Sequence, residues 1–157
     1  MGGNVSTCGS RTSKVGDEDV PLFHVSSMDF KEGELLQPAQ LSLILGVANG
    51  QDKSPHLTWS GAPTATESYC VTCFDPDAPS PSGFWHWVVY DIPAAVEELP
   101  SDCGRENSSS LPRGAKMLRN DCGKRCFLGA APPRGHGKHR YEFTIHALSE
   151  KHLEIDE

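Results

Sequence analysis

The sequence predicts an all-β fold, a sandwich or a barrel, in a single domain. Its foldable part consists of short apolar or alternating runs, each bounded by Pro, Gly or Ser. No helical period extends beyond about two turns. A length of 157 residues suits one domain with its own core and is short for two. Short strands at close spacing are typical of β-sandwiches and barrels.

The expected strands can be placed in order from residue 21. Pro21–Phe30 alternates in part and is interpreted as the first strand, and Leu41–Val47 is an apolar run with the length of a buried strand. Between them, Pro38 excludes a regular helix interior and predicts an extended connection. Four further segments complete the predicted strands: residues 56–63, 68–75, 84–93 and 141–148.

The long segment over residues 93–119 is expected to be mostly surface loop, because Ser, Asn, Gly and Pro dominate it. Within it, Ala94–Leu99 follows a proline and predicts a short helix. Asn107, Ser108 and Ser109 match the glycosylation sequon, which matters only in a secreted protein.

Residues 1–20 are small and polar, which predicts a disordered leader before a single domain over residues 21–157. Gly2 and Ser6 match the M-G-x-x-x-[ST] pattern of N-myristoylation, and Cys8 would be a palmitoylation site. Two acyl chains would anchor the chain stably at a membrane. A leader rich in Gly, Ser and Asn also matches this pattern easily, so an unmodified leader remains the alternative.

Charge and composition restrict the partners and the location. The net charge is −7 and no stripe of Arg and Lys is present, which argues against a nucleic-acid partner. No apolar run approaches the roughly 18 residues of a membrane-spanning helix. The N-terminus also lacks the basic region and apolar core of a secretory signal. We therefore expect a cytoplasmic protein, in peripheral contact with a membrane only if it is acylated.

Six cysteines raise the question of a disulfide framework or a zinc site. Cys70 and Cys73 form a CxxC pair, but they lie in an expected strand, where residues three apart face opposite sides. A zinc site needs thiolates that converge from a turn. Buried free thiols are the favoured interpretation, and no metal or cofactor is expected.

The strongest functional signal is the stretch Cys73–Ile92, which contains two acids and a histidine. In an extended segment Asp75 and Asp77 face the same way, while prolines stiffen the turn that follows. His86 lies at the start of the next strand. Taken alone, the acids could merely cap a turn, and a lone histidine is more often structural than a ligand.

Possible hydrogen-bond donors occur later in the chain. His136, His139 and Tyr141 lie close together in the sequence, and the Gly- and Pro-rich residues 129–137 could offer backbone amides to an anion. Acceptors on one wall and donors on the other would suit a zwitterionic or phosphate-bearing small ligand. Protonation of the histidines would strengthen anion binding below about pH 6.5.

Three motifs in combination closely resemble the phosphatidylethanolamine-binding protein family, above all its bacterial-type branch, which includes the YbhB and YbcL proteins. They are SPHLTWSGAP (54–63), DPDAPSPSGFWHWVVYDIP (75–93) and LRNDCGKRCFLGAAPPRGHGKHRYEFTIHAL (118–148). The resemblance covers about residues 22–149. It implies a Greek-key β-sandwich, with a large central sheet packed on a smaller one and short peripheral helices. It also implies a surface cavity for anions and phosphoryl head groups.

The resemblance also implies a set of site residues. Phe127 falls where an aromatic often borders the cavity mouth, and Asp77 is expected to orient its neighbours rather than to touch the ligand. The family normally continues past the last predicted strand with a helix and a further strand, whereas this chain stops at Glu157, so a short product or a fragment is expected. The implied ligand-site residues are Asp75, Asp77, Pro79, His86, Phe127, Gly129, Pro133, His139 and Tyr141.

Three functions are compatible with these residues. The leading hypothesis is a monomeric, non-enzymatic module that binds a phospholipid head group or another phosphoryl or anionic small molecule in a regulatory role. By resemblance, the same fold could instead inhibit a kinase or a serine protease through its cavity and loops. The third hypothesis, a metal-dependent hydrolase, is disfavoured because neither GxSxG nor HExxH occurs.

Overall fold

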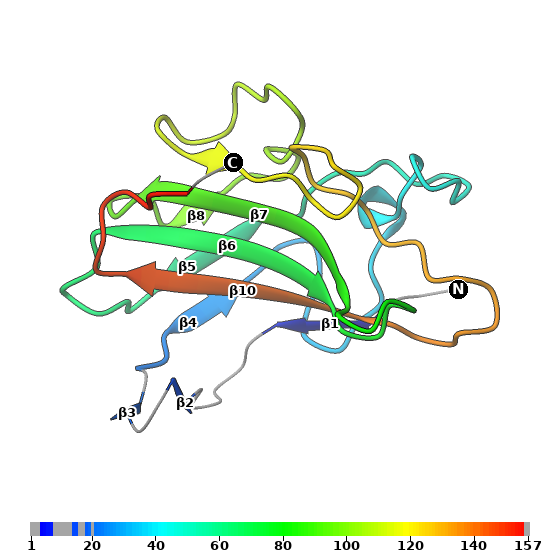
Figure 1. Ribbon diagram of the computed structural model, residues 1–157, viewed down its shortest axis with the longest axis horizontal. Coiled ribbons are helices and arrows are strands. Elements are labelled where there is room, and N and C mark those ends of the chain that lie inside the picture. The colour runs from blue at the N-terminus through cyan, green and yellow to red at the C-terminus, as the bar shows by residue number, and fades with distance from the viewer. Residues whose placement is uncertain (1–3, 8–13, 16–17, 20, 156–157) are drawn as a thin grey trace.

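Two packed β-sheets form the core of the protein, which confirms the predicted all-β class (Figure 1). The computed structural model describes residues 4–7, 14–15, 18–19 and 21–155, and the side chains of residues 21–155. The central sheet has the order β1-β10-β6-β7-β9 and the smaller one the order β4-β5-β8. The central strands are β1 (Asn4–Thr7), β6 (Ser68–Asp75), β7 (Phe84–Pro93), β9 (Lys116–Met117) and β10 (Arg140–Leu148), and the smaller sheet contains β4 (His24–Ser26), β5 (Leu57–Ser60) and β8 (Glu98–Leu99).

The central sheet has Greek-key connectivity. Of its four antiparallel strands, the last in the chain, β10, lies beside the first, β6, while β7 and β9 follow on the other side. This is the spatial order 4-1-2-3 of a Greek key. β10 pairs with β6 from Glu142 opposite Phe74 to Leu148 opposite Ser68. The connectivity therefore places the start of β10 next to the end of β6.

The core lies between the two sheets and accounts for most of the aromatic residues. Leu57 and Trp59 of β5 face the central sheet, where Val71, Trp87 and Phe143 are also buried. The rings of Trp59 and Tyr69 meet edge to face with centroids 5.2 Å apart. In β5 and β10 buried and less buried residues alternate, whereas β6 and β7 are buried on both faces for most of their length.

Two predicted elements were wrong. Leu41–Val47 is not a buried strand: apart from an isolated bridge between Leu41 and Ala130, it forms a turn. Ala94–Leu99 is not a helix, because its last two residues form β8 and pair with Leu57 and Thr58 of β5. The first strand is shorter than predicted, and the only helical segment among the described residues is the 3-10 turn η1 (Pro38–Gln40).

The N-terminal segment contains short strands that the sequence did not predict. β1 runs parallel to β10, and β2 (Lys14–Val15) pairs with β3 (Glu18–Asp19). Gly2 and Cys8, the predicted acylation sites, lie outside the described residues. Within the described ranges, no helix has the length and apolar character needed to cross a bilayer.

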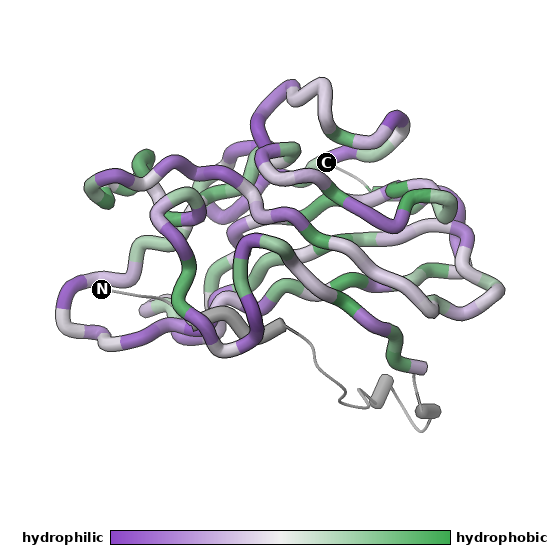
Figure 2. Tube along the Cα trace, turned by 180° about the vertical axis from the view of Figure 1, so that it is seen from behind, coloured by the Kyte–Doolittle hydropathy of each residue, from purple (hydrophilic) through white to green (hydrophobic). Residues whose placement is uncertain are grey.

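One end of the molecule gathers three loops from distant parts of the sequence. The turn between β6 and β7, the loop over residues 41–50 and the loop over residues 131–139 all lie at the right-hand end of Figure 1. Figure 2 shows the same end from behind. The loop over residues 41–50 has a green apolar tip, and the loop over residues 131–139 is mostly purple. The predicted site residues lie mainly on these loops and on the adjoining strand ends.

Candidate functional site

The first part of the site is the tight connection between β6 and β7. Asp75 is the last residue of β6, and Phe84 and His86 open β7. Gly83 makes the return possible because it has a φ of +72° and lies against the Phe74 ring, where any Cβ would overlap that ring. The turn therefore brings the Asp75 carboxylate close to the first residues of the next strand.

Asp75 and His139 form a buried pair at the bottom of the site. The Nδ1 of His139 lies 2.8 Å from Oδ2 of Asp75, and both side chains are almost completely buried. The other carboxylate oxygen, Oδ1, accepts the backbone N–H of Asp77 at 2.9 Å. Because an ionised carboxylate can only accept a hydrogen bond, Nδ1 of His139 is the donor and carries the ring proton.

The second ring nitrogen of His139 has no partner within the described part of the structure. Nε2 is buried and makes no hydrogen bond. A buried polar atom without a partner is costly, typically by about 1–3 kcal/mol, and needs an explanation. The His139 side chain also lines the cavity described below.

Tyr141 stands beside this pair on β10. Its ring meets the His86 ring edge to face at 5.1 Å. Burial, together with the negative charge of Asp75, raises the pKa of Tyr141 well above its usual range. The phenol therefore keeps its proton at any physiological pH and can act as a hydrogen-bond donor.

The His86 ring is held in place by a hydrogen bond to the backbone of Leu128. Its Nδ1 lies 2.8 Å from the carbonyl oxygen of Leu128, so this nitrogen carries the proton of the neutral ring. Burial lowers the pKa of His86, and the hydrogen bond to Leu128 and the charge of Asp75 offset this only in part. His86 is therefore neutral near pH 7, with an acceptor at Nε2.

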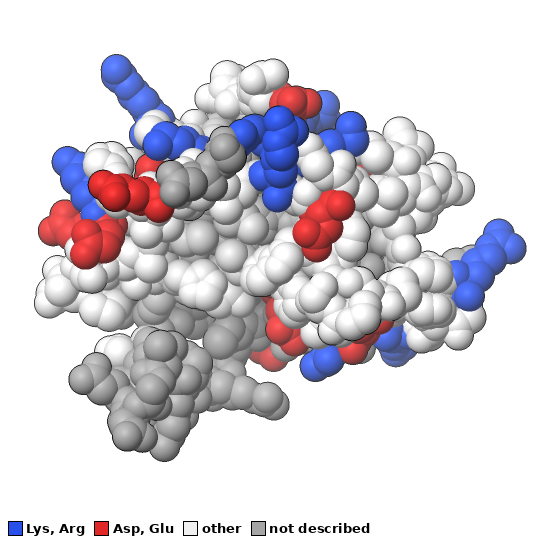
Figure 3. Space-filling view, viewed as in Figure 1, with Lys and Arg blue, Asp and Glu red and all other residues white. Residues whose placement is uncertain are grey.

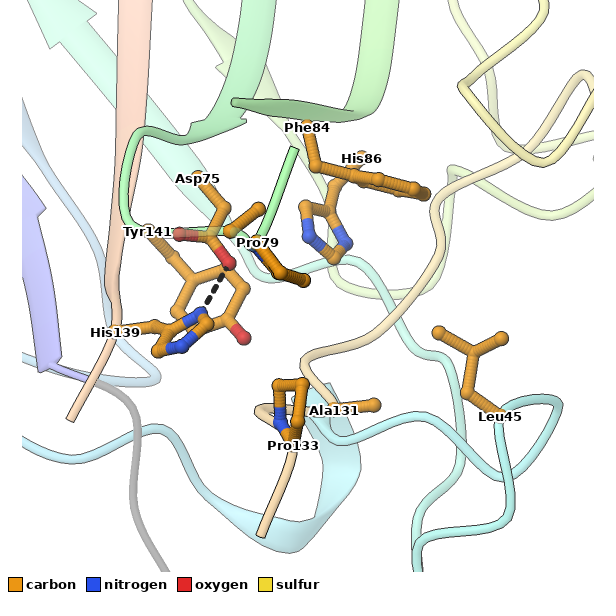
Figure 4. A pocket seen from close by; sticks show the side chains of 10 residues that line it. Leu45, Asp75, Pro79, Phe84, His86, Ala131, Pro133, His139 and Tyr141 are labelled. Carbon is orange, nitrogen blue, oxygen red and sulfur yellow. Dashed lines mark hydrogen bonds and ion pairs between the residues drawn. The ribbon is translucent and has the colours of Figure 1, made fainter. Parts of the chain in front are cut away.

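These side chains surround a cavity of about 180 Å³ (Figure 4). Asp75, Tyr141 and His139 lie together on one side, Phe84 and His86 on another, and Pro133, Ala131 and Leu45 close the remainder. The cavity is thus mostly apolar with a few polar groups, the usual composition of a small-molecule site. The lining residues are Leu45, Asp75, Ala78, Pro79, Phe84, His86, Ala131, Pro133, His139 and Tyr141.

Three of the residues named from the sequence do not line the cavity. Asp77 points to Arg140, which donates to it from Nε and Nη2 at 2.9 Å and from its backbone N–H at 2.8 Å. These bonds lower the pKa of Asp77 to about 2. Phe127, expected at the mouth, is instead in the core against Trp87. Gly129 packs so closely on Leu41 that a Cβ would overlap the backbone there.

Four lining residues were missed by sequence reasoning: Leu45, Ala78, Phe84 and Ala131. None has a titratable side chain; Ala78, Phe84 and Ala131 stand inside motifs that drew attention, whereas Leu45 does not. No group of three or more His, Cys, Asp or Glu side chains within the described part of the chain is arranged to hold a metal ion. Cys73 is buried and Cys70 half-buried, and burial raises the pKa of both thiols.

Comparison with known proteins shows one family. The family described as phosphatidylethanolamine-binding protein matches residues 26–157. The UPF0098 protein YbcL of Escherichia coli K12 is 46% identical over 134 residues, which cover 85% of this chain and 73% of YbcL. YbhB of the same organism is 43% identical over 131 residues, or 83% of this chain and 81% of YbhB.

Solved structures agree with these matches. The crystal structure of E. coli YbcL, described as a new member of the mammalian PEBP family, superposes with a TM-score of 0.82 over 85% of this chain and 81% of YbcL. A phosphatidylethanolamine-binding protein homologue from Chlamydia trachomatis, 24% identical, shares the fold with a TM-score of 0.61 over 86% of this chain and 79% of its own. The chain therefore belongs to the phosphatidylethanolamine-binding protein family, within the branch that includes YbcL and YbhB.

Proposed function

We propose that the protein is a non-enzymatic module that binds a small phosphoryl or similar anionic group in the cavity beside His139. The observation that carries this proposal is the buried, unpartnered Nε2 of His139. Its Nδ1 is already held by the Asp75 carboxylate. An anionic oxygen at Nε2 would favour the protonated ring, and Asp75 would stabilise the imidazolium that results.

The remaining polar groups suit the rest of such a ligand. Tyr141 also lines the cavity, and its phenol is a donor group from which a second anionic oxygen can accept. His86 offers an acceptor, which fits the ammonium of a zwitterion or the hydroxyl of a monoprotonated phosphate. A cavity of about 180 Å³ is smaller than a site for a drug-sized molecule and suits a head group.

The proposal can be tested by titrating the isotopically labelled protein with phosphoethanolamine while recording amide resonances. We expect shifts around His86, His139 and Tyr141 that disappear in His139→Gln. His24→Gln is the matched control because His24 is exposed on β4, outside the cavity lining. Inorganic phosphate and ethanolamine, titrated separately, show which part of the ligand is recognised. Shifts that cluster elsewhere, or that persist unchanged in a folded His139→Gln variant, would refute the assignment.

A further inference from the structure

The turn at the cavity mouth exposes three consecutive large apolar side chains. Leu43, Ile44 and Leu45 are 62%, 52% and 46% exposed. Leu45 also lines the cavity. Apolar surface therefore continues from the cavity wall onto the tip of the turn, which is the green tip at the upper left of Figure 2. We call Leu43, Ile44 and Leu45 the apolar tip.

Hydrogen bonds hold the apolar tip in place. The N–H of Ile44 donates to Oδ2 of Asp52 at 2.9 Å, and the N–H of Leu45 donates to Oγ of Ser42 at 3.0 Å. The other oxygen of Asp52 accepts the N–H of Gly129 at 2.8 Å. One carboxylate thus ties the turn to the chain segment that bounds the cavity. These hydrogen bonds fix the position of the apolar tip relative to the cavity.

A basic loop lies at the same end of the molecule. Residues 132–138 include Arg134, His136 and Lys138, all exposed, and contain no acid. This local positive charge contrasts with the net charge of −7 of the whole chain. At the right-hand end of Figure 3, a basic side chain projects below a surface of uncharged atoms.

We propose that this end of the molecule docks on a phospholipid surface. In this arrangement the apolar tip enters the boundary between head groups and acyl chains, the basic loop faces the anionic surface, and the cavity takes one phosphoryl head group. The inference rests on the proposed function, since the cavity must accept a phosphoryl group. Short apolar segments with basic neighbours are a common way to hold a protein at a membrane interface.

The apolar tip favours a membrane over the other possible occupants. A free small ligand would gain nothing from Leu43 and Ile44, which lie outside the cavity lining. A stable protein interface usually buries about 800 Å² on each partner, far more than three side chains of one turn supply. A bilayer, in contrast, presents phosphate groups and apolar chains within a few ångströms of each other.

The test is sedimentation of the unacylated 157-residue chain with vesicles of phosphatidylethanolamine and phosphatidylglycerol. Leu43→Ser combined with Ile44→Ser should weaken vesicle binding by about tenfold, from the apolar area lost. The single variant Leu43→Ser has a matched control in Leu22→Ser, which also removes an exposed leucine. Leu22 lies two residues before β4, and β4 starts at the opposite end of the molecule in Figure 1. We expect vesicle binding by Leu22→Ser to equal that of the unaltered chain.

The outcomes separate this inference from the proposed function. If the double variant loses vesicle binding but keeps the phosphoethanolamine shifts, the docking proposal stands. If vesicle binding is unchanged in the double variant, docking through the apolar tip is refuted while the head-group site is unaffected. Absence of phosphoethanolamine shifts in the unaltered chain would refute the site itself. Concentration-dependent dimers that the double variant abolishes would instead identify a second copy as the occupant.

Discussion

Each of the two cavity histidines has one ring nitrogen held by the protein. His139 is held by the Asp75 carboxylate, and His86 by the Leu128 carbonyl. Fixing one nitrogen sets the orientation of the ring and determines which nitrogen carries the proton. Both neutral rings therefore present an acceptor at Nε2, and only His139 has a carboxylate beside it that would stabilise a second ring proton.

The protonation of His86 gives a first prediction. Burial lowers its pKa, so the folded protein binds this proton less readily than the unfolded chain. His86 should therefore titrate below its usual value of about 6.5, and its contribution to stability should decline as the pH falls through that range. Nuclear magnetic resonance of the imidazole C–H groups measures the midpoint. A midpoint at or above 6.5 would contradict the burial argument.

Asp75 gives a second prediction, with Asp77 as its control. Asp75→Asn keeps the shape of the side chain, but its amide must turn a donor toward either the N–H of Asp77 or the Nδ1–H of His139. We expect a loss of about 1–3 kcal/mol in the free energy of unfolding. Asp77→Asn affects a partly exposed ion pair and should cost less than about 1 kcal/mol. Urea denaturation of both variants compares the two, and equal costs would argue against a buried pair at Asp75.

Residue chemistry explains why only part of the site could be predicted. Asp75, His86, His139 and Tyr141 were found because titratable groups near turns attract attention and matched family motifs. Leu45 and the other apolar lining residues show no such signal in one sequence. Phe127 was misplaced because a motif position does not reveal which way a side chain points, and this ring packs toward Trp87.

At the scale of elements, the turn at residues 41–50 shows how an apolar run can mislead. Its composition is that of a buried strand, but Gly46 and Asn49 have φ values of +85° and +64° and reverse the chain. Gly50 then lies so close to the backbone of Leu41 and Ser42 that a Cβ would not fit. Hydrophobic pattern alone cannot distinguish a buried strand from an apolar surface turn.

Asp52 gives a third prediction, at this element. It has a φ of +50°, which Asn tolerates better than Ala, and its two oxygens accept from Ile44 and Gly129. Asp52→Ala loses both hydrogen bonds, whereas Asp52→Asn can keep one. We expect the amide protons of Ile44 and Gly129 to exchange faster in both variants, and fastest in Asp52→Ala. Unchanged protection of these two amides in Asp52→Ala would show that the carboxylate does not fix the turn.

At the scale of the whole molecule, the Greek key assembles the site from distant segments. Asp75 and His139 are 64 positions apart in the sequence and become hydrogen-bonded because β10 crosses to lie beside β6. Five strands, β4, β5, β6, β7 and β10, were predicted from apolar or alternating runs, whereas β1, β2, β3, β8 and β9 were not. The order of the strands in the sheet was not predictable from the residues, because strand pairing depends on which faces are buried together. The Greek-key order was expected only from the family resemblance.

The last described residues are tied to the same sheet through Asp91. This buried side chain on β7 accepts the N–H of Leu153 at 2.9 Å and Nζ of Lys116 at 3.1 Å. Burial raises the pKa of Asp91, but these two hydrogen bonds together with the positive charges of Lys116 and His152 outweigh it and leave the pKa below its usual value. The carboxylate therefore stabilises the folded state at neutral pH. That contribution should be lost as the pH falls from about 4 through the lowered pKa.

Asp91→Asn should release the segment around Leu153 and cost about 1–3 kcal/mol in the free energy of unfolding at pH 7. Asp102→Asn is the matched control, because Asp91 and Asp102 have φ values of +55° and +70°. Among the described residues the Asp102 carboxylate forms an ion pair with exposed Arg105, so its substitution should cost much less. The difference between the two variants should shrink on acidification, since protonated Asp91 resembles the amide. Limited proteolysis should cut Asp91→Asn near its C-terminus, whereas equal cleavage of both variants would mean that Asp91 does not hold this segment.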